Sequence, residues 1–255
     1  MPTARSRPER AVPHTATMTT ILTGRELLPI PPGRVLLSDR RLQRRWQVDL
    51  RPFHLAAVPV TTNLRYGHDT RSPADPSAGG PSALAGPSAS AEGRAGRLPA
   101  VNVSWWDAVR FCNSLSEREG LAPPYLIDGE SVVWDEAADG YRLPTEAEWE
   151  HACRAGTAEP RYGELGKIAW YRDNSGERLH EPGGKLPNAW GLYDMLGNTW
   201  DWCWDVYDAE VYGSYRVLRG GGWFDEHWSC RASVRRRSHP DFTVDDVSFR
   251  LARSI

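Results

Sequence analysis

The sequence is poor in cysteine, in long apolar runs and in blocks of basic residues, and each shortage excludes a class of protein. Its 255 residues include four cysteines and no CxxC pair, so their spacing predicts neither a zinc knuckle nor a redox dithiol. No stretch approaches the roughly 18 apolar residues that span a bilayer, and the basic first residues lack a following apolar segment. We therefore expect a cytoplasmic protein that does not contact a membrane, with free and mostly buried thiols.

The charge balance and the absent catalytic motifs narrow the function further. A formal net charge of -2 without a sustained Lys and Arg block argues against DNA or RNA as a partner. No GxSxG, Walker, HExxH or dinucleotide-binding pattern is present. Hydrolase, nucleotide and hydride chemistry are therefore not supported by any local motif.

Tryptophan, glycine and proline are abundant instead, with 12, 23 and 20 residues. This composition predicts a loop-rich fold whose irregular backbone is held by large aromatic side chains. We expect one domain over residues 25–255, because a chain of this length buries one substantial core. Residues 1–24 are polar and aperiodic, which predicts a disordered arm, and translation starting at Met18 stays open. Residues 71–96 are mostly Pro, Ser, Ala and Gly and predict a flexible surface insertion.

Two helices have clear start signals in the sequence. Ser104 and Asp107 form a capping-box pattern, and apolar residues then recur at helical spacing until Gly120, placing Cys112 on the core face. Thr145 and Glu148 repeat the pattern for a second helix that ends before residue 156.

Short strands are predicted on both sides of these helices. Alternation in residues 27–50 predicts strands joined by a Pro-Gly turn, and residues 52–63 continue the sheet before turning at residues 59–63. Asp128 and Gly129 lie between two β-type runs and indicate a hairpin. The alternation of Val247, Phe249 and Leu251 predicts a last, half-buried strand.

Five blocks of the sequence, read in order, resemble the signature blocks of the formylglycine-generating-enzyme-like (sulfatase-modifying-factor) family. They are VNVSWWDAVRFCNSLS, YRLPTEAEWEHACRAGT, NAWGLYDMLGNTWDWCWD, RVLRGGGWF and SFRLAR. The resemblance covers residues 27–255, with the Pro/Ser/Ala/Gly segment as an insertion. It implies an α+β, C-type-lectin-like fold with little regular secondary structure.

The family resemblance also shows what this chain lacks. In formylglycine generators, copper is held by a cysteine two residues after the aromatic of the glycine-rich block and by a second cysteine five residues later. Trp223 is the aromatic here, and the first cysteine position holds Asp225. A carboxylate is a hard ligand and does not replace a thiolate that binds copper(I), so copper is not expected. Cys230 lies at the second position, but CRASVRR also matches the strand that follows the pair, which favours a structural thiol.

The block GLYDMLGNTWDW resembles the block that carries one calcium site in the family. Carried over residue by residue, the ligands are the side chains of Asp194 and Asp201 and the backbone carbonyls of Gly197 and Thr199. Oxygen ligands suit calcium. A metal-free network of Asx turns around the same loop is the alternative.

An oxidative enzyme without the thiol pair would have to hold its metal through other groups. Asp225 and His227 lie two residues apart, and with His239 or His68 they resemble a facial iron triad. Solvated loop residues are the competing interpretation. The candidate catalytic residues are therefore Trp223, Asp225, His227 and Arg231.

The glycine-rich turn at residues 219–224 has two interpretations as well. Glycines let a ligand approach the backbone beside Trp223, or they permit a tight strand crossing. The nearby arginines predict ion pairing or anion binding equally; they are Arg231, Arg235, Arg236 and Arg237.

Three functions remain open from the sequence. The first is a tailoring or maturation enzyme, metal- and oxygen-dependent, that acts on a small metabolite or peptide in a biosynthetic pathway. The second is a non-catalytic, lectin-like binding module whose loops are ordered by calcium. Formylglycine generation on a sulfatase is the third, and it requires Cys230 to meet another thiol. The sequence leaves the substrate and the oligomeric state open.

Overall fold

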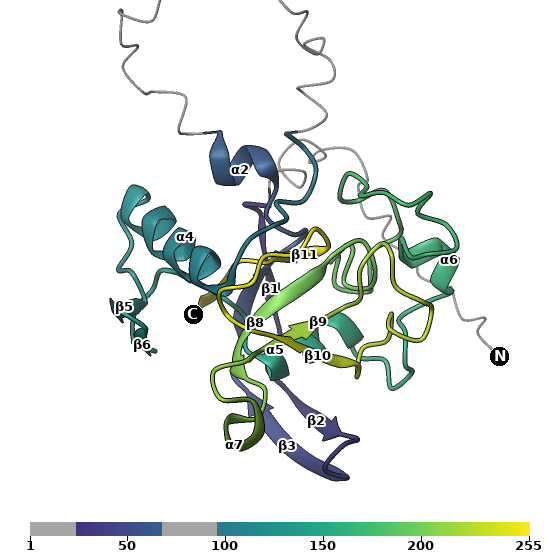
Figure 1. The fold of residues 1–255 in the computed structure, drawn as a ribbon, viewed down its shortest axis with the longest axis horizontal. Helices are drawn as coiled ribbons and strands as arrows, with labels where there is room; N and C mark the ends of the chain where they lie inside the picture. The colour runs from purple at the N-terminus through teal and green to yellow at the C-terminus, as the bar shows by residue number, and fades with distance from the viewer. Residues whose placement is uncertain (1–23, 68–95) are drawn as a thin grey trace, which may run out of the picture.

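A computed structural model describes residues 24–67 and 96–255 of the chain. The predicted N-terminal arm and most of the predicted insertion lie outside these described residues. Helices and short, mainly antiparallel strands share the described part, as the α+β expectation requires (Figure 1). None of its helices combines the length and the apolar character needed to cross a bilayer.

One four-stranded antiparallel sheet joins distant parts of the chain in the order β1-β4-β12-β7. Its strands are β1 (Leu27–Ile30), β4 (Phe53–Ala56), β12 (Ala252–Ser254) and β7 (Tyr141–Arg142). The C-terminal strand β12 lies between β4 and β7 and pairs with both. The two ends of the described chain are therefore tied into one sheet.

A second four-stranded sheet has the order β10-β9-β8-β11, and the glycine-rich turn follows the end of its inner strand β9. Its strands are β10 (Arg235–Ser238), β9 (Arg216–Arg219), β8 (Trp200–Val206) and β11 (Val247–Phe249). Strand β11 runs parallel to β8, whereas the other pairs are antiparallel. This arrangement brings residue 246, just before β11, next to the residues that follow β9.

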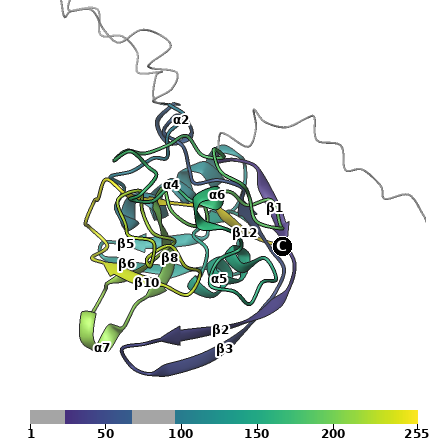
Figure 2. The ribbon, with the colours of Figure 1, turned by 90° about the vertical axis from the view of Figure 1, so that its right-hand side faces the viewer.

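Two separate hairpins complete the strands. The first consists of β2 (Gly33–Asp39) and β3 (Arg44–Leu50), and it projects from the body of the protein (Figures 1 and 2). The second, β5 (Tyr125–Asp128) with β6 (Ser131–Trp134), confirms the hairpin predicted around residues 128 and 129. Strands β1 and β2 follow each other as predicted, but β1 pairs with β4 and not with β2.

Both predicted capped helices are confirmed. Helix α4 (Trp105–Arg118) begins after Ser104, and α5 (Glu146–Arg154) begins after Thr145, each with a complete capping box. Cys112 is fully buried on the core face of α4. Three shorter helices lie outside the predicted elements or replace predicted turns; they are α2 (Thr62–Tyr66), α6 (Leu165–Ile168) and α7 (Ala209–Tyr212).

Two predicted details are wrong, and both errors have a local cause. The segment predicted to turn at residues 59–63 starts helix α2, because the Thr61 side chain caps it by accepting a hydrogen bond from the Leu64 amide. The predicted last strand at 247–251 ends at residue 249 as β11, and a separate strand, β12, begins at residue 252; residues 247–251 are fully buried, not half-buried. The break falls at Arg250, whose guanidinium is fully buried and donates to Asp201.

The tryptophans hold this loop-rich structure together, as the composition predicts. One apolar cluster packs α4 against the strand β8 and contains Trp105, Trp200 and Trp202, all buried. A second cluster surrounds Trp149 of α5. Indole nitrogens also anchor loops, since Trp105 donates to the Cys203 carbonyl and Trp202 donates to the Val103 carbonyl.

Candidate functional site

The three glycines that follow β9 are required by the backbone and by close neighbours. Gly220 and Gly221 have φ values of 108° and 89°, in the left-handed region that favours glycine. A Cβ on Gly222 would lie 2.4 Å from Oδ2 of Asp246. The turn is therefore a tight crossing, as one of the two sequence interpretations held, and it also brings a carboxyl group against the backbone of residue 222.

Asp225 is held by hydrogen bonds inside this turn. Its Oδ2 accepts from the Gly222 amide at 2.8 Å and from Trp200 Nε1 at 2.6 Å. Its Oδ1 lies 3.4 Å from a guanidinium nitrogen of Arg236. The carboxylate that occupies the cysteine position thus closes the turn and satisfies the indole N–H of a buried tryptophan.

Asp246 lies on the other side of Gly222 and is much less well paired. No other described residue donates a hydrogen bond to its carboxylate or forms an ion pair with it; its own backbone amide and the charge of Arg236 only partly offset the cost of burial. Burial raises the pKa of Asp246 to about 6, and the negative charge of Asp225 adds to this effect. A partly buried carboxyl group that lacks a partner costs stability, which makes it a candidate for a functional group.

A cavity of about 500 Å³ opens beside Asp246 and Trp200, the tryptophan that donates to Asp225. Its walls come from β8, β9, β10 and the segment before β11, and they combine three aromatic rings with charged groups. The lining residues are Trp200, Leu218, Trp223, Phe224, Arg236, Arg237, Ser238, Val244, Asp245, Asp246 and Val247. This mixture of apolar walls and a few polar groups is typical of a small-molecule site.

Trp223 forms part of this wall, as expected from its place after the glycines. Its backbone amide donates to the Asn198 carbonyl at 2.9 Å, and its ring packs edge-on against Phe224. The buried Nε1 of Trp223 has no acceptor among the described residues. A buried N–H without a partner costs about 1–3 kcal/mol, and a bound ligand could supply the acceptor.

The proposed iron ligands are not brought together by the structure. His227 is exposed, and its carbonyl accepts from Arg161 at 2.6 Å. His239 packs against Tyr215 and pairs with Asp241. No three His, Cys, Asp or Glu side chains gather as a metal-binding group within residues 24–67 and 96–255. His68 lies outside the described residues. The residues present do not fit a facial iron triad, because Asp225 is already engaged, the His227 ring is exposed and His239 contacts Tyr215.

The arginines near the glycine turn divide between the two predicted roles. Arg236 pairs with Asp225, and Arg235 pairs with Asp39 and Glu146. Arg237 stacks on Tyr212, with its guanidinium 3.7 Å from the ring centroid. Arg231 contacts no described carboxylate and does not line the cavity beside Trp223. Ion pairing therefore explains Arg235 and Arg236, but it leaves Arg231 unexplained.

The burial of the four cysteines bears on the copper site that the sequence argues against. Cys112, Cys153, Cys203 and Cys230 are all free and fully buried. Burial raises the pKa of Cys230 to about 12, and burial also raises the pKa of the other three thiols. Protonated, buried thiols are poor copper ligands because the thiolate is the form that binds metal. The structural interpretation of Cys230 accordingly has the better physical support.

The loop predicted to bind calcium contains buried oxygens that lack partners. Asp194 Oδ1, Thr199 Oγ1 and Asp201 Oδ1 are buried without a hydrogen-bond partner in the described chain. Burial raises the pKa of Asp194 to about 6, and the charge of Asp201 contributes to this shift. Such uncompensated hard oxygens fit calcium. However, Arg250 donates to Asp201 Oδ2 at 2.8 Å, and the Gly197 carbonyl accepts from the Thr199 amide. Calcium therefore stays a prediction.

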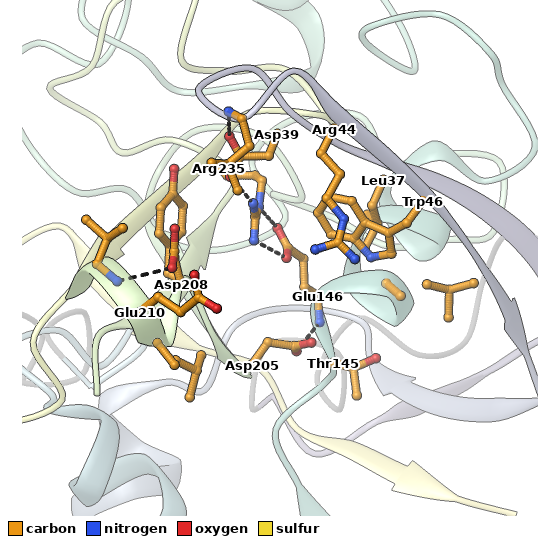
Figure 3. Close-up of a pocket in the computed structure, with 17 residues that line it drawn as sticks. Leu37, Asp39, Arg44, Trp46, Thr145, Glu146, Asp205, Asp208, Glu210 and Arg235 are labelled. Carbon is orange, nitrogen blue, oxygen red and sulfur yellow. Dashed lines mark hydrogen bonds and ion pairs between the residues drawn. The ribbon is translucent and has the colours of Figure 1, made fainter. Parts of the chain in front are cut away.

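A second cavity of about 640 Å³ was not predicted from the sequence. It lies between the β2–β3 hairpin, the start of α5 and the segment around α7 (Figure 3). Arg235 reaches it and bridges Asp39, at 2.9 Å, and Glu146, at 2.5 Å (Figure 3). Glu146 and Glu150 of α5 also pair with the fully buried Arg219. The i, i+4 spacing of these two glutamates places them on one face of the helix, and it was the sequence feature that could have indicated this acidic cluster.

Comparison with known proteins places these observations in context. The model of the family described as sulfatase-modifying factor enzyme 1-like domain matches residues 12–255. The chain is 30% identical over 195 residues to the chaperone protein LppX of Paenibacillus barcinonensis, covering 61% of this chain and 70% of that protein. It is 31% identical over 261 residues to the formylglycine-generating enzyme of Streptomyces coelicolor, covering 80% and 79%. Among solved structures, Treponema denticola variable protein 1 matches with a TM-score of 0.72 and 29% identity, covering 90% and 95%.

Proposed function

Because the chain belongs to the sulfatase-modifying factor enzyme 1-like family and has its fold, we propose that it is a tailoring or maturation enzyme that acts on a small metabolite or peptide. The substrate would bind in the cavity beside Trp223, which from here on is called the tryptophan cavity. Family membership supports an enzyme, whereas the fold alone does not determine an activity.

The observation that carries this proposal is the state of Asp246 in the tryptophan cavity. Its carboxyl group is partly buried, forms no hydrogen bond or ion pair with another described side chain, and has a pKa raised to about 6 by burial. A carboxyl group of this pKa is able to give or accept a proton near neutral pH. The unpaired Trp223 Nε1 supplies a hydrogen-bond donor in the same wall.

Formylglycine generation is not supported by the residues present. That reaction in the family uses copper held by two thiolates, and Asp225 replaces one of them while Cys230 is buried with a raised pKa. Oxygen-dependent oxidation with another metal stays a prediction, because the described residues do not supply the iron ligands on which it rested.

A non-catalytic binding module is the second candidate, and Asp225 favours it. The residue at the catalytic cysteine position serves the structure of the turn, since it accepts from Gly222 and Trp200. The relative LppX is named as a chaperone protein, which agrees with a binding role for some members of this group. In this alternative, the tryptophan cavity holds a ligand without changing it.

The two functions are separated by following the fate of small molecules. Purified protein is incubated with a metabolite and peptide extract, and all masses that are consumed, produced or retained are recorded by mass spectrometry. Oxygen consumption is recorded in the same samples. An enzyme converts at least one mass over many turnovers, whereas a binding module retains a mass unchanged and releases it on denaturation.

A matched pair of variants assigns the result to the tryptophan cavity. Val244→Trp places an indole in the cavity lining, while Phe242→Trp enlarges an exposed side chain on the same loop outside the lining. The proposal predicts that Val244→Trp abolishes conversion and that Phe242→Trp retains it. Conversion that survives Val244→Trp would place the reaction elsewhere in the protein.

A further inference from the structure

A third cavity, of about 370 Å³, separates the turn after β2 from the segment that leads into β10. Arginine dominates its charged residues, with four guanidinium groups and one carboxylate. The lining residues are Ser38, Asp39, Arg40, Arg41, Tyr207, Trp228, Arg231, Ser233, Val234 and Arg235. We call it the arginine cavity, and it shares no lining residue with the tryptophan cavity.

Two of its four arginines are neutralised by carboxylates. Arg41 pairs with Asp208, and Arg235 lies between Asp39 and Glu146, as Figure 3 shows for Arg235. These ion pairs account for the single carboxylate that lines the cavity. They leave Arg40 and Arg231, for which no carboxylate partner is found among the described residues.

Arg231 is held in place without being neutralised. Its Nε donates to the Trp228 carbonyl at 2.7 Å, which leaves its terminal nitrogens without a described partner. Burial lowers the pKa of Arg231, and the positive charges of Arg40 and Arg161 lower it further. Arg161 donates to the carbonyls of Cys230 and His227, so its charge is not compensated by a carboxylate either. Arg40 and Arg231 therefore repel each other at the cavity, and Arg161, which does not line it, adds to the repulsion on Arg231.

Uncompensated like charges at a cavity are stabilised when an anion binds between them. Guanidinium groups bind phosphate and carboxylate with two parallel hydrogen bonds, and they do so better than ammonium groups. The hydroxyl groups of Ser38 and Ser233 line the same cavity and are further possible donors. The exposed ring of Trp228 offers an apolar face beside the charged groups.

We propose that the arginine cavity binds the phosphate or carboxylate group of an anionic ligand, with Arg231 and Arg40 as the direct contacts and Trp228 against the rest of the ligand. This binding is independent of any reaction in the tryptophan cavity, because the two cavities are built from different residues.

Isothermal titration calorimetry with inorganic phosphate and with succinate tests the proposal and identifies the anion. Ionic strength is held constant with sodium chloride. We expect saturable binding of at least one probe, with one site per chain. Stronger binding of phosphate indicates a phosphorylated ligand, and stronger binding of succinate indicates a carboxylate ligand. Heats that do not saturate with either probe, or that chloride alone reproduces, overturn the proposal.

Three variants connect the binding to named residues. Arg231→Ala and Arg40→Ala each remove a charge-assisted contact and should weaken binding roughly ten-fold or more. Arg45→Ala removes an exposed arginine of the same hairpin that does not line the cavity, and it should leave binding unchanged. Equal affinity in the wild type and in Arg231→Ala overturns the proposal.

Two further measurements keep the test clear of folding effects and of the proposed enzyme function. Arg231→Lys retains the charge and loses the two-pronged geometry, so intermediate affinity in a variant with normal thermal unfolding supports a direct contact. Val244→Trp blocks the tryptophan cavity and should leave anion binding intact. Loss of anion binding in that variant would show that the two cavities are one site and would contradict the assignment.

Discussion

Asp225 provides a sharp test of what replaces a catalytic cysteine in this protein. If its carboxylate holds the glycine turn together, then Asp225→Ala destabilises the protein whether or not a transition metal is present. If its carboxylate is a metal ligand, the loss of stability depends on the metal. The structure favours the first outcome, because Gly222 and Trp200 already donate to the same carboxylate oxygen.

The size of the effect follows from three contacts of Asp225. Each hydrogen bond to its charged group contributes about 1.5–3 kcal/mol, and little of this is lost to solvent because the side chain is only 11% exposed. The contact with the exposed Arg236 adds roughly 0–1 kcal/mol. Removing the carboxylate also leaves Nε1 of Trp200, which is 1% exposed, without a described acceptor. We expect Asp225→Ala to cost about 3 kcal/mol and Asp225→Asn roughly half as much, since the amide oxygen still accepts.

Urea unfolding monitored by circular dichroism measures these differences. Wild type and variants are compared in calcium-containing buffer, with and without a chelator of transition metals. Glu226→Ala is the matched control, because Glu226 pairs with Arg172 at the surface and should contribute less than about 1 kcal/mol. A structural role for this carboxylate is refuted if Asp225→Ala unfolds like the wild type, or if the chelator removes the difference between them.

Three other predictions follow from the same region and from the calcium loop. The pKa of Asp246 is raised to about 6 in the folded protein, so its contribution to folding stability is favourable below pH 4 and is lost as the pH rises through 6. Asp246→Asn should therefore be more stable than wild type by about 1–2 kcal/mol at pH 8 and equal to it at pH 3.5. Urea unfolding at both pH values measures this difference. Gly222→Ala places a Cβ 2.4 Å from the Asp246 carboxylate and should lower the free energy of unfolding by about 1–3 kcal/mol. In a double-mutant cycle, Asp246→Ala should restore most of this loss. Strictly additive effects of the two substitutions would contradict the contact. If calcium binds at the loop of Asp194 and Asp201, elemental analysis should find one calcium per chain. Asp194→Asn should remove this calcium and lower the melting temperature. A metal-free protein whose melting temperature is unchanged by a chelator would reject the site.

Elements defined by local chemistry were predictable from the sequence. The capping boxes at Ser104 and Thr145 satisfy the first amides of α4 and α5 with side chains only three residues away. The hairpin at Asp128 and Gly129 depends on the same short range. By contrast, the start of α2 is not evident from the sequence, because Thr61 suits a turn and is also a good N-cap residue.

Contacts between distant segments were beyond the reach of local patterns. Arg219 and Arg250 are fully buried, although arginine is rarely fully buried in proteins. Their burial is possible because each is paired with acidic groups from other elements. The position of Asp246 beside Gly222 depends on the parallel pairing of β11 with β8. The alternation of residues 247–251 predicts a strand but not its partner, so local patterns point to the loop at 223–231 and not to Asp246.

The distribution of unpaired groups explains why the catalytic loop of the family is a poor guide to chemistry in this chain. Asp225 stands at the position of a reactive cysteine, yet its hydrogen-bonding capacity is used by the turn that contains it. Two groups without a side-chain partner come from other segments: Asp246 precedes β11, and Arg40 follows β2. A polar group that remains unpaired costs stability and is retained most readily where it binds something. Ligand recognition in this protein is therefore expected at the two cavities to which those segments contribute, and substitutions at Asp246 and Arg40 should alter binding more specifically than substitutions at Asp225, which should act mainly through stability.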